Sequence, residues 1–214
     1  MELKSALSDL GLRKRLVLVH ASPLVDSQSL LDSLLETTNG FFTPAFTPRS
    51  LLPLDFHPAR ASKEANADAQ PFHPAMPADE AFGSFPELVR RSKKAKRSIH
   101  PVLSFTGIGA EHALHVQTIS EPYAPISALA GEDGAILLIG MDQRMNFSIH
   151  YGEKLAGRMQ FIRWALTENG IVECTNFPGD PEGFNAIELT IKPFVRQVEA
   201  GGIILQAIPV NEML

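Results

Sequence analysis

The chain has 214 residues, of which 44% are hydrophobic and 20% are charged, a composition typical of globular proteins. A chain of this length can bury a large core without disulfides or a structural metal, which excludes a small stapled scaffold. Its net charge of −5 argues against nucleic acid as the main partner, because phosphate binding requires a broad basic surface. We therefore predict a single domain over residues 1–214.

The cellular setting follows from further sequence features. Cys174 is the single cysteine, so no intramolecular disulfide can form, which suits a reducing cytoplasm. The sequence contains no apolar run of about eighteen residues, the length of a membrane helix. Residues 1–7 also lack the basic flank and long apolar run of a secretion signal. These features predict a cytoplasmic protein with no membrane partner, and they leave its oligomeric state open.

The first part of the chain alternates helices and strands. Apolar residues over 3–10 recur at helical spacing before Gly11, and the apolar run 16–20 predicts a strand. Asp26 or Ser27 can cap a helix that ends near residue 39, and residues 41–46 predict a second strand. This order is typical of α/β folds, in which ligands usually bind at the carboxyl ends of buried strands.

A proline-rich stretch follows. Eight of the sixteen prolines lie between residues 44 and 86, together with Phe56, His57, Phe72 and His73. Prolines at this density predict a long irregular excursion, at about residues 47–84, and loops of this length are commonly functional or disordered.

The rest of the chain carries more predicted elements. Short helices are expected over residues 85–91, 110–116 and 148–155, and strands over 101–108, 135–139 and 203–208. Asn169-Gly170 lies between apolar runs at 161–167 and 171–175, which is a strong hairpin signal. Residues 184–191 suggest a helix that Pro193 must start, kink or break.

His150 and Glu153 form the first candidate site. Three residues apart on the predicted helix, they share a face, so the carboxylate can orient the imidazole or stabilise its charged form. That arrangement is typical of a general base. The alternatives are a structural histidine, and a metal site that would need a third ligand such as His20, His57, His73 or His100.

Two further groups of polar residues could bind a ligand. Arg97 and Ser98 offer a charge and a hydroxyl to a phosphate or polar substrate, near His100 and Ser104. The basic run over residues 90–97 can equally be a solvated charged surface. The turn His20-Ala21-Ser22 ends the first strand, and alone it indicates little more than a polar turn.

Several enzyme classes are disfavoured. The sequence has no Gly-x-Ser-x-Gly elbow, and Cys174 lies in a predicted strand with no histidine nearby in sequence. Dinucleotide and Walker phosphate-binding loops are also absent from the sequence. Nucleophilic, nicotinamide-dependent and P-loop enzymes are therefore not expected.

Taken in order, these segments resemble the aminoglycoside 3-N-acetyltransferase family of antibiotic acetyltransferases. The similarity runs from about Leu3 to the C-terminus. Its most specific parts are the Arg-Ser-x-His-Pro and His-x-x-Glu motifs, in that order. The other matching segments are Val19-His20-Ala21-Ser22, residues 42–47, Ser104 with residues 107–109, residues 123–127 and residues 135–140.

The resemblance implies an α/β fold built on a mixed sheet flanked by helices, with acetyl-CoA as donor. It also implies that an amine of an aminoglycoside-type or related amino substrate attacks the thioester directly in a ternary complex. His150 would be the base or its immediate partner, oriented by Glu153, with the near-neutral pKa that suits proton transfer. The residues expected to line the coenzyme side are His20, Ala21, Ser22, Arg97, Ser98, His100 and Ser104.

The chain also departs from the family. Residues 23–26 pass directly into the next helix, where family members generally have a glycine-containing segment. Residues 179–184 match the family's pattern near the acceptor site only loosely. Asp180 and Glu182 there could attract a cationic substrate, but we favour their interpretation as turn residues. The shortened segment motivates an alternative function as a non-catalytic acyl-CoA or small-molecule binding protein. A metal-dependent hydrolase that uses His150, Glu153 and another histidine is a further alternative.

Overall fold

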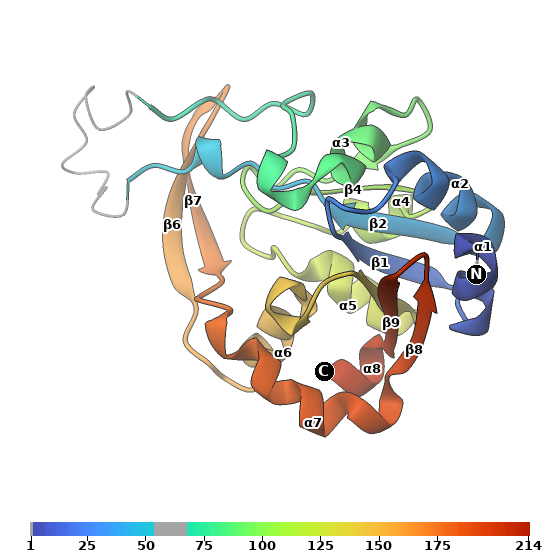
Figure 1. Cartoon of the computed structure of the whole chain (residues 1–214). Coiled ribbons are helices and arrows are strands. Elements are labelled where there is room, and N and C mark those ends of the chain that lie inside the picture. The colour runs from blue at the N-terminus through green and yellow to red at the C-terminus, as the bar shows by residue number, and fades with distance from the viewer. Residues whose placement is uncertain (1, 54–67) are drawn as a thin grey trace.

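The computed structural model of the chain describes residues 2–53 and 68–214 (Figure 1). A mixed seven-stranded sheet runs in the order β3-β4-β2-β1-β5-β9-β8. Strands β2, β1 and β5 are parallel to one another, and each further neighbour pairs antiparallel. The strands are β1 Leu16–Ala21, β2 Gly40–Pro44, β3 Lys96–Arg97, β4 Phe105–Ile108, β5 Ala135–Ile139, β8 Arg196–Ala200 and β9 Ile203–Pro209.

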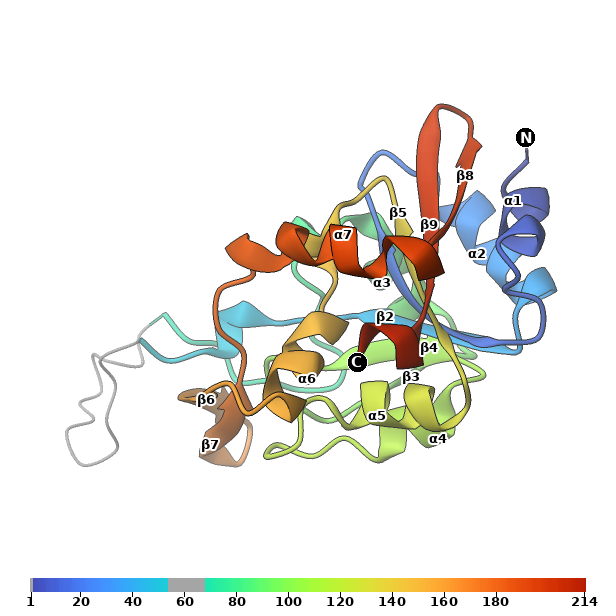
Figure 2. The ribbon, with the colours of Figure 1, turned by 90° about the horizontal axis from the view of Figure 1, so that it is seen from below.

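Helices cover both faces of this sheet (Figure 2). One face packs against α1 Leu3–Asp9, α2 Ser27–Thr37 and α3 Ser84–Arg91. The other packs against α4 Glu111–His115, α5 Ala124–Gly131, α6 Ser148–Leu155 and α8 Val210–Met213. The central strands are buried on both sides. In β1, Val17 and Val19 belong to the core on the side of α1, α2 and α3, while Leu16 and Leu18 belong to the core on the opposite side. The expected mixed sheet with flanking helices is confirmed.

A separate hairpin lies beside the sheet. Strands β6 Phe161–Thr167 and β7 Gly170–Phe177 pair antiparallel as the predicted hairpin, with Glu168 and Asn169 in the turn and Gly170 as the first residue of β7. Two described segments of the proline-rich stretch, at residues 51–52 and at Phe72, lie along β6 (Figure 1), where the Leu52 N–H donates to the Trp164 carbonyl at 2.9 Å. The Phe72 N–H likewise donates to the Leu166 carbonyl at 2.9 Å. The described part of this stretch includes the 3₁₀ turns Pro48–Ser50 and Glu80–Phe82, whereas Phe56 and His57 lie outside the described residues.

Two local predictions differ from the structure. The strand predicted over residues 101–108 begins only at Phe105 in the structure, because residues 101–104 form a turn. The predicted helix near Pro193 is broken into the 3₁₀ segment Glu182–Ile187, α7 Glu188–Ile191 and the 3₁₀ turn Lys192–Phe194. Among the described residues, no helix combines the length and apolarity needed to cross a bilayer.

Candidate active site

The two central parallel strands, β1 and β5, end side by side. Ala21 pairs with Ile139, and the Ser22 N–H donates to the Ile139 carbonyl at 2.9 Å. From there the chain continues in opposite directions, because β1 leads to α2 on one face and β5 leads to α6 on the other. Ligands bind α/β sheets at such a switch point, and the His20-Ala21-Ser22 turn lies there.

Gly140 makes the close approach of these two strand ends possible. Its φ of +63° lies in the left-handed region, and a Cβ there would be 3.1 Å from Cβ of Ser22. The Gly140 N–H donates to the Ile204 carbonyl at 2.8 Å, so the turn after β5 is also tied to β9.

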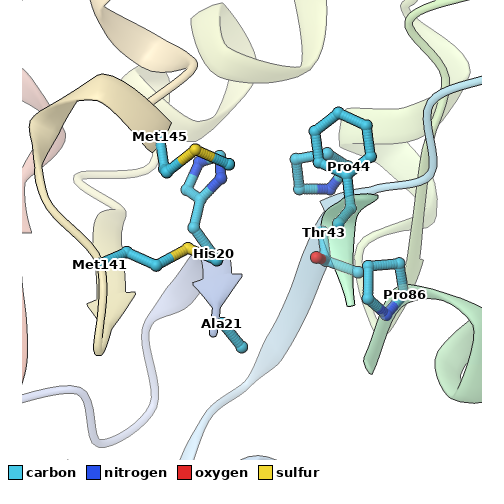
Figure 3. Close-up of a pocket in the computed structure, with 8 residues that line it drawn as sticks. His20, Ala21, Thr43, Pro44, Pro86, Met141 and Met145 are labelled. Carbon is cyan, nitrogen blue, oxygen red and sulfur yellow. The ribbon is translucent and has the colours of Figure 1, made fainter. Parts of the chain in front are cut away.

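His20 lies at the centre of this edge of the sheet (Figure 3). Burial lowers its pKa to about 3, so the imidazole is neutral, and its buried Nε2 has no hydrogen-bond partner among the described residues. The ring borders a cavity of about 10 Å³, room for about one water molecule. The lining residues are His20, Ala21, Thr43, Pro44, Phe82, Pro86, Met141 and Met145.

Two larger cavities flank residues 22–24. One, of about 370 Å³, includes Ser22, Leu24 and Gly140 in its lining. The other, of about 660 Å³, lies by Pro23. It is lined by Pro23, Arg49, Pro77, Ala78, Glu80, Gly83, Ser84, Glu87 and Arg91. The short connection between β1 and α2 therefore separates two hollows, each large enough for part of an extended ligand.

His150 and Glu153 meet as their spacing predicts. Nδ1 of His150 lies 3.1 Å from Oε2 of Glu153, and both side chains are largely buried. Because a carboxylate accepts hydrogen bonds, this contact places the proton of the neutral imidazole on Nδ1 and leaves Nε2 as a proton acceptor. Oε1, the second oxygen of Glu153, is paired with the guanidinium of Arg158.

An apolar cage surrounds the His150 ring. The Phe147 ring lies 5.3 Å away and the Phe184 ring 4.6 Å away, centroid to centroid, both edge-on. His150 is 5% exposed, and this burial, together with the charge of Arg158, lowers its pKa to about 4, against the opposing effect of Asp180. The near-neutral pKa expected from the sequence was wrong, because three-residue spacing does not reveal how deeply a ring is buried.

Arg97 and Ser104 form a hydrogen-bonded cluster beside β2. Nε of Arg97 donates to Oγ of Ser104 at 3.0 Å, and both side chains donate to the Ala45 carbonyl, at 2.7 and 3.0 Å. Arg97 also donates to the carbonyls of Pro74 and Met76. Its guanidinium is thus occupied by groups of the chain itself.

Ser98 and His100 organise the turn before β4. Nδ1 of His100 accepts the N–H groups of Val102 and Leu103 at 3.1 and 3.0 Å. Oγ of Ser98 accepts the Phe105 N–H at 2.8 Å. Burial lowers the pKa of His100 to about 3, which keeps its ring neutral and able to accept. The Arg-Ser-x-His-Pro motif therefore has a structural use, and its placement on the coenzyme side stays a prediction.

Acidic side chains lie around the His150 helix. Oδ1 of Asp180 accepts the Glu182 N–H at 2.8 Å, as expected of a turn residue. Asp142 accepts hydrogen bonds from Arg144 and from Nδ2 of Asn185, which hold its pKa below the usual range. Asp142 and Arg158 were not predicted from the sequence, since each reaches its partner through a loop.

A metal site would need ligands that converge. Within residues 2–53 and 68–214, no group of three His, Cys, Asp or Glu side chains is placed to hold a metal ion. His57, one of the expected third ligands, lies outside the described residues.

Several solved structures share this fold, and some of them are named as aminoglycoside acetyltransferases. AAC-VIa, bound to sisomicin, is 24% identical with a TM-score of 0.80, over 99% of this chain and 92% of that one. AAC-IIIb in complex with CoASH is 20% identical with a TM-score of 0.80, over 99% and 91%. YokD from Bacillus subtilis is 20% identical with a TM-score of 0.81, over 99% and 94%.

These likenesses establish the fold, and a family model adds the relationship in sequence. Among curated protein sequences, none matches the chain. The model described as aminoglycoside 3-N-acetyltransferase matches residues 20–199, from the His20 turn to the end of β8, and so includes the His150–Glu153 pair. The chain therefore belongs to the aminoglycoside 3-N-acetyltransferase family.

Proposed function

We propose that this chain acetylates an amine of an aminoglycoside-type or related amino substrate, with His150 as the general base. As a member of its family it is an acyltransferase, and acetyl-CoA is its co-substrate. The observation that carries the assignment is the contact between Nδ1 of His150 and Glu153, 3.1 Å apart, on the helix that follows β5.

The protonation state of His150 suits it to accept a proton. The nitrogen of a neutral amine becomes positively charged when it attacks a thioester, so a base must take up its proton as the amide forms. With a pKa of about 4, the imidazole is neutral at physiological pH, and Nε2 can receive that proton. Glu153 then stabilises the imidazolium through Nδ1, which compensates for the low basicity of the buried ring.

The proposed transfer proceeds directly from the thioester to the amine. The amine nitrogen forms a bond to the acetyl carbonyl carbon, and the bond from that carbon to sulfur breaks. The amine proton goes to Nε2 of His150, and coenzyme A leaves as its thiolate.

The coenzyme is proposed to lie across residues 20–24. His20, Ala21 and Ser22 line cavities at the switch point, and Arg49 and Arg91 border the 660 Å³ cavity on the far side of Pro23. Guanidinium groups are suited to bind the phosphates of coenzyme A. In this proposal a neighbouring wall of the coenzyme site is held in place by the side chains of Arg97, Ser98, His100 and Ser104.

The acceptor is proposed to approach the His150 helix from the side away from the proposed coenzyme site. Asp142, Asp180 and Glu182 lie on the two segments that meet there, and Glu182 is exposed. Carboxylates at this position favour a polycationic substrate, and the relative AAC-VIa is seen bound to sisomicin. A non-aminoglycoside amine with the same charge pattern would satisfy the same contacts.

The His150→Ala variant tests the proposal. Removal of a general base typically lowers the rate by a factor of about 100 to 10,000, while the coenzyme site at β1 stays intact. We expect this loss in kcat, with saturable binding of acetyl-CoA retained in a calorimetric titration. His115→Ala, an exposed histidine on α4, is the matched control and should keep full activity.

Two outcomes would contradict the proposal in different ways. Full activity of His150→Ala would show that another group accepts the proton. Tight acetyl-CoA binding by the unaltered chain, without acetylation of any amine in a broad panel, would favour the non-catalytic binding protein.

A further inference from the structure

Helix α6 ends in a turn that returns the chain over Glu153. Gly157 has a φ of +80°, and its N–H donates to the Lys154 carbonyl at 3.0 Å. The Arg158 N–H donates to the Glu153 carbonyl at 2.9 Å. These two bonds form a Schellman motif, in which the residue after the glycine lies back along the helix. The backbone thereby brings Arg158 to the side chain of Glu153.

The segment that carries Arg158 is itself anchored to the core. Nε2 of Gln160 donates to the Arg158 carbonyl at 3.1 Å, and Oε1 of Gln160 accepts the hydroxyl of Tyr123 at 2.9 Å. Tyr123 is fully buried on the sheet face that α5 and α6 cover. A continuous set of contacts thus runs from this tyrosine through Gln160, Arg158 and Glu153 to the His150 ring.

The carboxylate of Glu153 divides its two oxygens between these neighbours. Oε2 faces Nδ1 of His150, and Oε1 is paired with the guanidinium of Arg158. A carboxylate held by one oxygen loses the freedom to rotate its other oxygen away from the imidazole. We propose that Arg158 is a positioning residue, which fixes the Glu153 carboxylate so that it orients His150 for proton transfer. This inference rests on the proposed function of His150.

The charge of Arg158 gives the proposal a specific readout. Among the described residues, the charged groups that act on His150 are Glu153 on its own helix, Arg158 after that helix, and Asp180 on the segment after β7. The positive charge of Arg158 disfavours the imidazolium, whereas the negative charge of Asp180 favours it. Loss of either charge should therefore shift the pH at which His150 becomes protonated, in opposite directions.

The test compares Arg158→Met, which keeps the length of the side chain, with Arg158→Lys, which keeps its charge. For Arg158→Met we expect kcat to fall about tenfold, with an unchanged KM for acetyl-CoA. The acid limb of the profile of kcat/KM against pH should move to higher pH. Arg158→Lys should restore the wild-type limb, and Asp180→Asn should move it to lower pH.

Lys154→Met is the matched control. Like Arg158→Met it removes one positive charge near the end of α6, but Lys154 pairs with Glu121 and not with Glu153. Its acid limb should coincide with that of the unaltered chain. Arg158 is largely exposed, so its variants should fold, and thermal melting checks this. If Arg158→Met and Lys154→Met give the same profile while His150→Ala is inactive, the positioning role fails and the proposed function stands. If His150→Ala is fully active, the proposed function itself fails.

Discussion

The guanidinium of Arg97 joins three separate segments of the chain. It bonds to Ala45 after β2, to the carbonyls of Pro74 and Met76 in the proline-rich stretch, and to Ser104 before β4. It also lies over the Phe72 ring, 5.2 Å from the centroid. The contacts to Ala45 and Met76 are partly buried, so removing the guanidinium leaves the Met76 carbonyl without this donor, while Ser104 still donates to Ala45.

We therefore expect Arg97→Met to lower the free energy of unfolding by about 2–4 kcal/mol, as measured by urea denaturation. The exposed Arg13→Met should change it by less than about 0.5 kcal/mol. The affinity of the folded Arg97→Met variant for acetyl-CoA should stay within about threefold of that of the unaltered chain, because the hydrogen bonds of Arg97 stabilise the fold and do not contact the coenzyme. Weakened coenzyme binding with unchanged stability would instead make Arg97 a direct ligand.

The sequence predicts a residue pair when both members lie on one regular element. His150 and Glu153 are three residues apart on a helix, so their contact follows from helical geometry. Arg158 reaches Glu153 through a glycine turn beyond the helix end, and no periodic pattern specifies that path. The two hydrogen bonds to Nδ1 of His100 likewise depend on a turn that resembles a strand in sequence.

Strand β4 packs so closely against β2 that glycine is required between them. A Cβ on Gly107 would lie 2.3 Å from the Phe41 carbonyl oxygen and 2.7 Å from Cβ of Phe42. Neither atom can move without a shift of the strand, because both belong to buried central residues. The pairing of β2 with β4 therefore depends on this glycine.

Gly107→Ala should lower the free energy of unfolding by about 2–4 kcal/mol, since it forces a methyl group into a packed core. Gly131→Ala is the matched control: Gly131 lies in α5, and a Cβ there meets nothing within 4 Å. That variant should be neutral or stabilising by up to about 1 kcal/mol, because alanine favours the helix. The difference in urea midpoint measures both effects, and equal midpoints would disprove the packing argument.

Elements were predictable where burial imposes a pattern. The apolar runs of β1 and β5 specify strands, and Asn169-Gly170 specifies the β6–β7 hairpin, although its turn begins one residue earlier, at Glu168. Strand β8 was not predicted, because Arg196, Gln197 and Glu199 make this edge strand polar. Helix α5 was also not predicted as a helix, because its Pro125 and Gly131 weaken the helical signal.

The central sheet draws its strands from both ends of the sequence. Strand β1, from the first twenty-one residues, lies next to β5, which pairs with β9 near the C-terminus. This order brings His20 and the start of the His150 helix to one edge of the sheet, although well over a hundred residues separate them. Helix and strand patterns predicted most of the elements and the family resemblance implied a mixed sheet, but neither specified the order of the strands. A single domain over residues 1–214 stays a prediction.

Three buried histidines make the stability of the whole molecule sensitive to acid. Burial lowers the pKa of His20 and His100 to about 3 and that of His150 to about 4, against 6.5 for an ordinary histidine. Below pH 6.5 the unfolded chain therefore binds protons that the folded chain does not. Burial of these neutral histidines therefore does not lower the free energy of unfolding above that pH, but it lowers this free energy progressively as the pH falls toward 4.

The window between about pH 6.5 and 5 isolates this effect, since most carboxylates are still ionised there. Each buried histidine contributes a slope of up to about 1 kcal/mol per pH unit to the free energy of unfolding. His20→Gln removes one of the three titrating groups, so urea denaturation across this window should give a shallower slope than for the unaltered chain. His115→Gln, an exposed histidine, should leave the slope unchanged. Equal slopes for the unaltered chain and His20→Gln would mean that His20 also accepts a proton in the folded state, and that the switch point is open to water.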